Sequence, residues 1–229
     1  MESERVAGLP GAGPRWQRRK TERPQEILSA ARDLFLQQGF RETRMIDVAR
    51  HAGVRPGTLY VYYRNKEALL EAVVKEAVAP AIAFAEQRLQ GRHDSAAALL
   101  KELMLGWWHE FGATPASGVL WLMVAEAAHF PEMAQLLVEE IQVRARRICM
   151  TVLKRGMASG EFRRIDAEQV ALVLMAPLTW ASVHRASLAP FDPGFSDLPR
   201  YLETHLDIVL YGLFAQPSRA GAKAAHGGV

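Results

Sequence analysis

The sequence contains one cysteine, Cys149, and one asparagine, Asn65. A single cysteine excludes an intrachain disulfide and a thiolate zinc cage, and it fits a reducing cytoplasm. No apolar signal segment follows Met1, and the longest uncharged apolar run, residues 169–183, is too short to cross a bilayer. Strand-like alternation bounded by turn residues is also missing. We therefore expect a cytoplasmic, helical protein without a membrane segment.

The residues that are abundant favour helices and a large core. Hydrophobic residues make up 49% of the 229 positions, and Ala, Leu, Glu, Arg and Gln recur in long runs. The net charge of +3 is distributed unevenly. Residues 1–66 carry 13 Lys and Arg against 7 Asp and Glu, whereas the remainder carries 15 against 18. A basic front end on a mildly acidic body suggests that only the N-terminal part meets a polyanion.

The first 23 residues, rich in Gly, Pro and charge, are predicted to form a flexible basic arm. Its cations immediately precede the first helix, and we expect them to meet phosphates: Arg18, Arg19 and Lys20. Pro24 suits the first turn of a helix, and Gly39 suits its end. The apolar face between them consists of Ile27, Ala30, Ala31, Leu34 and Phe35.

Residues 43–67 predict the second and third helices, which are short and joined at Gly53. The start of a fourth helix, capped by Asn65, follows them. Thr43 is the expected cap of the second helix, which would bury Ile46, Val48, Ala49 and Ala52. Pro56 begins the third helix, with Leu59 and Tyr63 four positions apart on its anchoring face. A helix that leaves tyrosines and small residues on its other sides can enter the DNA major groove.

These residues carry a resemblance to a known family. The segments Asp47-Val48-Ala49, Ala52-Gly53-Val54, Gly57-Thr58-Leu59-Tyr60 and Lys66-Glu67 resemble the N-terminal domain of TetR/AcrR transcriptional regulators. The resemblance implies an all-α protein of about nine helices, with a three-helix helix-turn-helix domain over residues 24–70. It also implies a helical effector-binding and dimerisation domain over residues 71–215, before a flexible tail at 216–229.

The same resemblance implies particular DNA contacts. Five residues match positions that contact the DNA backbone in the family: Thr43, Thr58, Tyr60, Tyr62 and Lys66. Five others match positions where base or groove contacts vary: Arg44, Arg55, Pro56, Gly57 and Val61. At Arg55-Pro56 the family usually has Ser or Thr followed by a polar residue. A helix cap is thereby lost and a cation is gained.

The larger body contains aromatic and Met residues on several helices, which predict either a packed core or the wall of a cavity. We expect a small apolar or amphipathic effector to bind there, close to Trp107, Trp108, Trp121 and His129. The full predicted set is Met104, Trp107, Trp108, Phe111, Trp121, Glu126, His129, Phe130, Met175 and Trp180.

The last two long helices, opened by Asp166 and by Asp197, are apolar around much of their girth. A monomer would leave much of this apolar surface exposed to solvent. The two helices are therefore predicted to form the interface of a homodimer. The terminal helix would contribute Leu198, Leu202, Leu206, Val209 and Leu213. A dimer presents two recognition helices to a roughly palindromic double-stranded operator. We expect a repressor that its effector releases, with the helix from Lys66 through Pro80 as the lever.

Three alternatives remain open at this stage. An enzyme is not supported, because the sequence lacks a phosphate-binding loop, a His-Glu-x-x-His pair and a Gly-x-Ser-x-Gly elbow; no cofactor or metal is expected. A redox or metal sensor would use Cys149 with nearby histidines, although a lone cysteine on an apolar helix is usually inert. Arg144, Arg146 and Arg147 suggest a second nucleic-acid face, or a charged surface paired with Glu139 and Glu140.

Overall fold

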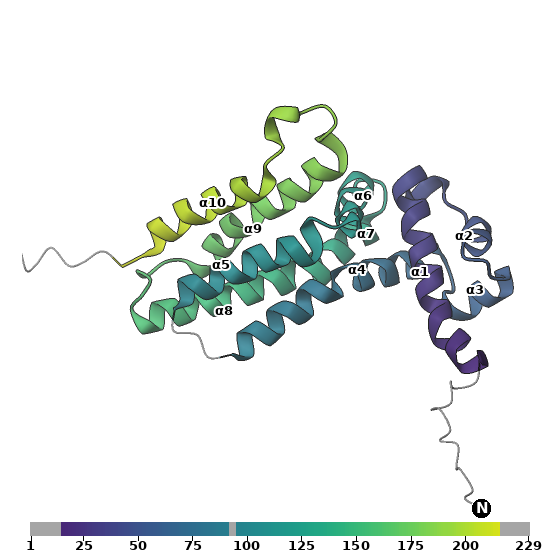
Figure 1. The fold of residues 1–229 in the computed structure, drawn as a ribbon, viewed down its shortest axis with the longest axis horizontal. Helices are drawn as coiled ribbons and strands as arrows, with labels where there is room; N and C mark the ends of the chain where they lie inside the picture. Colours follow the sequence, from purple (N-terminus) through teal and green to yellow (C-terminus); the bar gives the residue numbers. More distant parts are fainter. Residues whose placement is uncertain (1–14, 92–94, 216–229) are drawn as a thin grey trace, which may run out of the picture. The chain divides into compact units, whose positions relative to one another are not determined.

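The computed structural model describes residues 15–91 and 95–215 (Figure 1). Regular structure in these ranges is helical, apart from an isolated bridge between Phe162 and Phe214. The chain divides into two compact units after Val73. The predicted fold class, a helix-turn-helix unit ahead of a larger helical unit, is confirmed.

The first unit contains α1 (Arg15–Glu42), α2 (Met45–His51), α3 (Pro56–Tyr62) and the start of α4 (Lys66–Gln90). Ile27, Ala31 and Phe35 bury the inner face of α1, which packs on α2. The backbone leaves the helical region at Gly39, where φ is 85°. A positive φ costs glycine little, because it has no Cβ, so Gly39 is the predicted stop.

Two predicted helix starts are wrong. α1 begins at Arg15 and contains Pro24 in its interior, so residues 15–23 are helical rather than part of a separate arm; residues 1–14 lie outside the described ranges. α2 begins at Met45, which is buried, whereas Ile46 is 52% exposed. The cap of α2 is Arg44, one position later than expected. Val48 and Ala49 are buried as predicted, and Met45 takes the place of Ile46 on the inner face.

Thr43 does not cap α2. Its side chain is 1% exposed, and its Oγ1 donates to the carbonyl oxygen of Gly39 over 2.7 Å while accepting from Gln38 Nε2 over 3.2 Å. The hydroxyl therefore closes the end of α1. The N-cap position of α2 has no side-chain hydrogen bond.

The second unit is built on long helices that lie side by side, with α8 against α5 and α9, and α10 against α9 and α5 (Figure 1). Three π-helical turns, η1, η3 and η4, directly follow α5, α7 and α9. The bounds are α5 (Ala96–Trp107), η1 (Trp108–Gly112), η2 (Pro115–Ser117), α6 (Gly118–Glu126), α7 (Pro131–Leu137), η3 (Val138–Gln142), α8 (Val143–Ser159), α9 (Ala167–Val183), η4 (His184–Leu188), η5 (Pro193–Phe195) and α10 (Leu198–Leu213).

The helix starts of this unit follow the predicted caps. Ser95 Oγ accepts from the Ala98 amide over 3.1 Å, and Asp166 Oδ1 accepts from the Glu168 amide over 3.0 Å. Asp197 Oδ1 likewise accepts from the Arg200 amide. Each bond satisfies an amide that has no partner within its own helix. None of the helices in the described ranges is long and apolar enough to cross a membrane.

Candidate DNA-binding surface and effector cavity

α3 leaves most of its side chains in solvent. Leu59 is fully buried and anchors the helix, whereas Val61 is 81% exposed and Tyr60 is 53% exposed. Tyr62 is also exposed, although its ring lies against Tyr63 with 6.5 Å between the centroids. Tyr60, Val61 and Tyr62 are consecutive exposed large side chains. Adjacent exposed apolar groups of this kind are typical of an interaction surface.

The turn between α2 and α3 depends on Gly53, whose φ is 65°. The Val54 amide donates to the Ala49 carbonyl oxygen over 2.9 Å and closes the turn. Arg55 occupies the N-cap position of α3 without a side-chain cap bond, as its sequence predicts. Arg55, Pro56 and Gly57 are all exposed.

A polar groove of about 620 Å³ lies beside this turn. Arg23 and Glu26 of α1 line it together with Arg55 and Thr58. Arg23 and Glu26 are additions to the sequence-based set. Arg23 could have been predicted as a DNA-binding candidate, because it continues the run of cations Arg18, Arg19 and Lys20. The position of the groove could not be predicted from the sequence. The side chains of residues 18–20 lie outside the described residues.

Lys66 has partners inside the first unit. Its Nζ donates to the carbonyl oxygens of Phe40 over 2.7 Å and of Arg41 over 3.0 Å, and it lies 4.5 Å from the centroid of the Phe40 ring. The cation is held at the end of α1, where carbonyls lack helical partners. The Lys66 ammonium group therefore has hydrogen-bond partners within the protein, at the position where the sequence predicts a DNA phosphate. Arg44, by contrast, is exposed.

The second unit contains a partly open apolar cavity of about 80 Å³, lined by residues of α4, α5, α6, α7, η3, α8 and α9. Three of the predicted effector residues line it: Met104, Trp107 and Met175. Phe111 supports this wall indirectly, since its ring packs edge-on against Trp107 with 5.3 Å between centroids. Trp108 is buried in the core but is not part of the lining.

The remaining predicted residues do not line this cavity. Trp121 on α6 and Trp180 on α9 are 41% and 47% exposed, and Glu126, His129 and Phe130 lie at the end of α6 and in the turn after it. Helical spacing identified apolar faces, but it could not tell which face meets which neighbour. The lining residues that sequence analysis missed are Ala81, Ile82, Ala85, Leu103, Leu120, Val124, Leu137, Ile141, Gln142, Ala145, Ile148, Cys149, Leu178 and Thr179.

Cys149 faces this cavity but is poorly suited to redox chemistry. Its side chain is 1% exposed, and burial raises the pKa of the thiol to about 12, against a smaller lowering by a backbone hydrogen bond. The thiolate is the reactive form, and it is hardly populated near neutral pH at such a pKa. Cys149 therefore belongs to the apolar wall.

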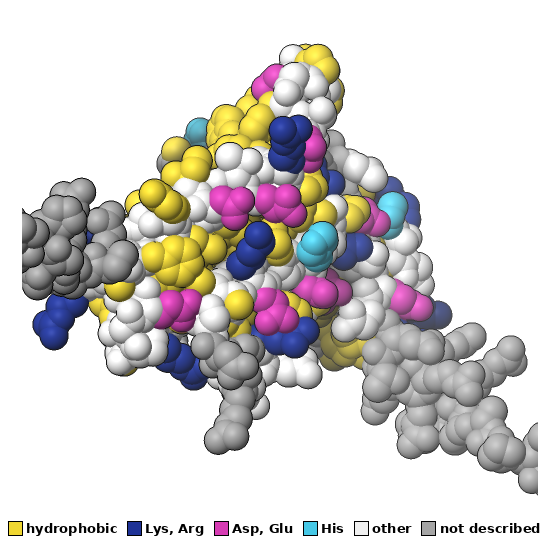
Figure 2. All heavy atoms as spheres, turned by 60° about the vertical axis from the view of Figure 1, so that its left-hand side comes forward, with side chains coloured by type: hydrophobic (Ala, Val, Ile, Leu, Met, Phe, Trp, Pro, Cys, Tyr) yellow, Lys and Arg dark blue, Asp and Glu magenta, His cyan; other side chains and the backbone are white. Residues whose placement is uncertain are grey.

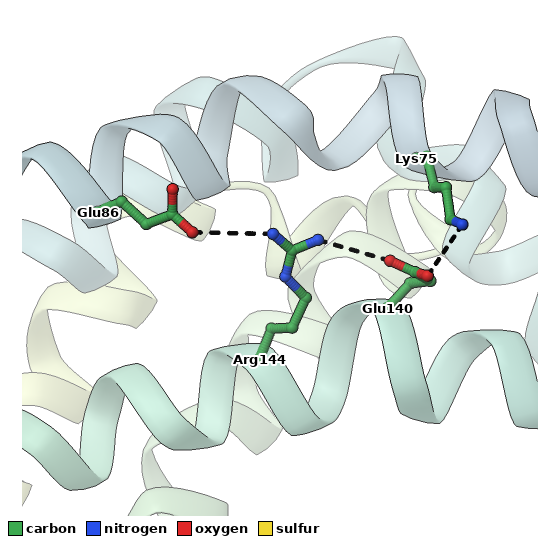
Figure 3. Close-up of polar contacts among 4 residues, drawn as sticks. All are labelled: Lys75, Glu86, Glu140 and Arg144. Carbon is green, nitrogen blue, oxygen red and sulfur yellow. Dashed lines mark hydrogen bonds and ion pairs between the residues drawn. The ribbon is translucent and has the colours of Figure 1, made fainter.

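An ion-pair ladder, Lys75–Glu140–Arg144–Glu86, joins α4 to η3 and α8 (Figure 3). Glu140 lies 3.2 Å from Lys75 Nζ and 3.5 Å from Arg144, whose other terminal nitrogen lies 3.8 Å from Glu86. Arg146 pairs with Glu168 over 3.6 Å. These pairings support the reading of the arginine-rich stretch as a salt-bridged surface rather than a second nucleic-acid face.

The outer sides of α9 and α10 leave large apolar groups in solvent. Val173 and Trp180 on α9 and Ile208 and Tyr211 on α10 are all at least 47% exposed. Leu198, Leu202, Leu206 and Leu213, which the sequence assigned to the dimer contact, are buried within the unit instead. Figure 2 shows hydrophobic side chains in patches over one face of the molecule, with charged side chains between them.

Two short helices joined by a glycine turn, the second of them exposed, are the arrangement of a helix-turn-helix DNA-binding unit. The comparisons agree. Residues 27–73 match bacterial regulatory proteins of the tetR family, and residues 92–198 match the tetracyclin repressor-like C-terminal domain. The chain belongs to the TetR family of DNA-binding transcriptional regulators, which is a family of regulators rather than enzymes.

Among curated relatives, the regulator UidR of Escherichia coli is 34% identical over 67 residues, or 29% of this chain. That match spans about a third of the length of UidR (34%). The repressor KstR2 of Rhodococcus jostii is 24% identical over 85% of this chain and 92% of its own.

Solved structures share the fold. A TetR-family regulator from Rhodococcus sp. is 25% identical, with a TM-score of 0.67 over 83% of this chain and 99% of its own. FadR of Bacillus subtilis, in complex with stearoyl-CoA, is 19% identical, with a TM-score of 0.70 over 82% and 98%.

Proposed function

We propose that the protein is a dimeric repressor that binds a roughly palindromic operator and leaves it when a small apolar or amphipathic effector occupies the cavity of the second unit. In a cell such a protein acts in the cytoplasm, beside the DNA. The observation that carries the proposal is the exposed surface of α3, above all Val61 and Tyr60.

The DNA-binding part of the proposal uses α3 as the recognition helix. Arg55, Pro56, Gly57 and Val61 face the base edges, and Thr58, Tyr60 and Tyr62 face the sugar-phosphate backbone. Arg44 and the groove residue Arg23 add cations at the margin of this surface. Arg18, Arg19 and Lys20 extend the basic charge toward the phosphates. Thr43 and Lys66 are left out, because internal hydrogen bonds engage them.

The effector part rests on the cavity and on the relatives. Full-length similarity to a repressor supports repression as the direction of control. The structural neighbour FadR holds stearoyl-CoA, which supports a ligand-responsive second unit. Because Ala81, Ile82 and Ala85 of α4 line the cavity, and α4 continues from the first unit, a ligand that displaces α4 has a direct route to DNA affinity.

Dimerisation is assigned to the outer faces of α9 and α10. Leu172, Val173 and Trp180 recur at helical spacing on α9, and Ile208 and Tyr211 do so on α10. Two copies of this surface would bury one another in a four-helix contact. A two-fold axis then relates two copies of α3, and this accounts for the palindromic operator.

Two linked measurements test the proposal. Genomic fragments retained by the purified protein are sequenced, and the enriched fragments should share an inverted repeat that a Tyr60→Ala, Tyr62→Ala double variant does not enrich. Fluorescence anisotropy on such a fragment then follows release by added apolar compounds. If the enriched DNA fragments shared no sequence motif, sequence-specific binding would be contradicted. If no compound that binds the protein weakened its complex with the operator, effector-driven release would be contradicted.

A further inference from the structure

The cavity of the second unit contains no charged side chain among the described residues that line it. Its walls are aliphatic, aromatic and sulfur-containing, and the two polar exceptions are Gln142 and Thr179. Thr179 Oγ1 donates to the Met175 carbonyl oxygen over 3.4 Å, which leaves the hydroxyl oxygen able to accept a bond from a ligand. Gln142 is exposed and therefore stands at the rim. Moving an ionised carboxylate into such a site is strongly unfavourable, because the charge loses its hydration and gains no partner.

Two cations that lie close to lining residues along the chain, Arg144 and Arg88, are already paired with carboxylates. Arg144, which precedes the lining residue Ala145, pairs with Glu140 and Glu86 (Figure 3). Arg88, one turn beyond Ala85 on α4, lies 3.1 Å from Glu102. Helical spacing turns the exposed Arg147 away from the lining side of α8. A carboxylate or phosphate at the rim would have to displace one of these acidic partners.

The volume of the cavity also limits its occupant. About 80 Å³ is less than an engineered apolar cavity of roughly 150 Å³ that binds benzene in another protein. An occupant as large as benzene must therefore move the wall or extend past the rim at Gln142. Met104 and Met175 are the adaptable members of that wall, because their unbranched side chains can change rotamer at low cost.

We propose that this cavity selects an uncharged, mainly hydrocarbon ligand with a single hydrogen-bonding group, and that it discriminates against carboxylates and acyl-CoA thioesters of the same chain length. The hydrocarbon part packs between Met104, Trp107 and Met175, and the polar group meets Thr179 or Gln142. The effector role of this ligand rests on the proposed function, whereas its chemical class rests on the cavity alone.

Isothermal titration of the full-length protein with 1-octanol, octanoate and octanoyl-CoA tests the chemical class. Octanol is expected to bind at least about 100-fold more tightly than octanoate, because the charge cannot be solvated in the cavity. Thr179→Val should weaken octanol binding about five-fold through loss of one hydrogen bond. Ala145→Phe, which fills the cavity, should abolish octanol binding. Trp121→Ala serves as the control, because Trp121 is exposed and does not line the cavity. This variant should bind octanol as tightly as the wild type.

Octanoate or octanoyl-CoA binding as tightly as octanol would overturn the proposal. So would unchanged octanol binding by both Thr179→Val and Ala145→Phe, with a thermal melt confirming that each variant is folded. Operator release is measured separately by anisotropy. Selective octanol binding that leaves the operator complex intact would support the ligand class and contradict the proposed effector role.

Discussion

Glu161 caps α5 from a turn far along the chain: the Ala96 amide donates to its Oε2 over 2.6 Å. The Ala97 amide and the Ser95 hydroxyl donate to its other oxygen over 3.0 and 2.7 Å. The neighbouring residue Phe162 bridges to Phe214 at the end of α10. One carboxylate therefore fixes the start of α5 to the turn that joins α8 and α9.

Replacing Glu161 by Ala should lower the free energy of unfolding of the second unit by about 1–2 kcal/mol at pH 7, since two helix amides lose their acceptor. Urea unfolding followed by circular dichroism measures the change. Glu203→Ala is the matched control, because Glu203 is an exposed carboxylate on α10. Equal stability of the two variants would show that the cap contributes nothing.

The effect of Glu161→Ala should depend on pH. Burial acts to raise the pKa of Glu161, but hydrogen bonds from Ser95, Ala97 and Ala96 outweigh it and lower the pKa below its ordinary value of 4.5. The stabilisation is therefore complete above pH 4.5 and is lost as pH falls through the lowered pKa. The difference between wild type and Glu161→Ala should shrink in acid, and a difference that grows there would contradict this assignment.

Lys66→Met should destabilise the first unit by about 1–2 kcal/mol, because two carbonyls at the end of α1 lose a charged donor. The slope of log K against log salt for DNA binding should stay the same, since Lys66 is not assigned to a phosphate. Lys20→Met is the comparison, and there the slope should fall by about 0.9, because Lys20 is assigned to a phosphate. A reduced slope for Lys66→Met would restore Lys66 to the DNA surface.

Tyr60→Phe removes one hydroxyl from the exposed side of α3 and should weaken DNA binding about five- to ten-fold for every sequence, as expected for one backbone hydrogen bond. Val61→Ala should instead change the preference at one base position. Competition with a panel of singly substituted operators separates the two effects. Tyr201→Phe in the second unit controls for loss of a phenol, and an equal loss there would argue against a DNA contact.

Ile208→Glu should convert the dimer to a monomer, because it introduces a charge into the proposed contact between two copies of α10. Sedimentation velocity is expected to show a dissociation constant raised at least about 100-fold. Val138→Glu also adds a charge at an exposed apolar position, but it lies on η3 and should leave the dimer intact. A monomeric wild-type protein would contradict the contact outright.

Local chemistry made much of the fold predictable. Ser95, Asp166 and Asp197 each cap a helix, Gly53 makes the turn, and Leu59 anchors α3. Each of these features depends on neighbours within a few positions. The sequence predicts the start of α1 at Pro24, because proline is preferred in a first turn and disfavoured in a helix interior, but the helix continues through Pro24 to Arg15.

The candidate sites depend on distant neighbours and were only partly predictable. Lys66 meets Phe40, and Trp180 reaches solvent rather than the cavity, although both residues fit their predicted roles by spacing. The π-helical turns η1 and η3 change the register of the faces that follow α5 and α7. Sequence periodicity assumes regular turns, so it could not assign Ile141 and Gln142 to the cavity wall.

Hydroxyl-radical footprinting of an enriched operator fragment tests the central claim most directly. The account predicts two protected half-sites about one helical turn apart, related by a two-fold axis. Both should be protected by the wild type and left open by the Tyr60→Ala, Tyr62→Ala variant. A single unpaired footprint, or protection that the variant retains in full, would contradict it.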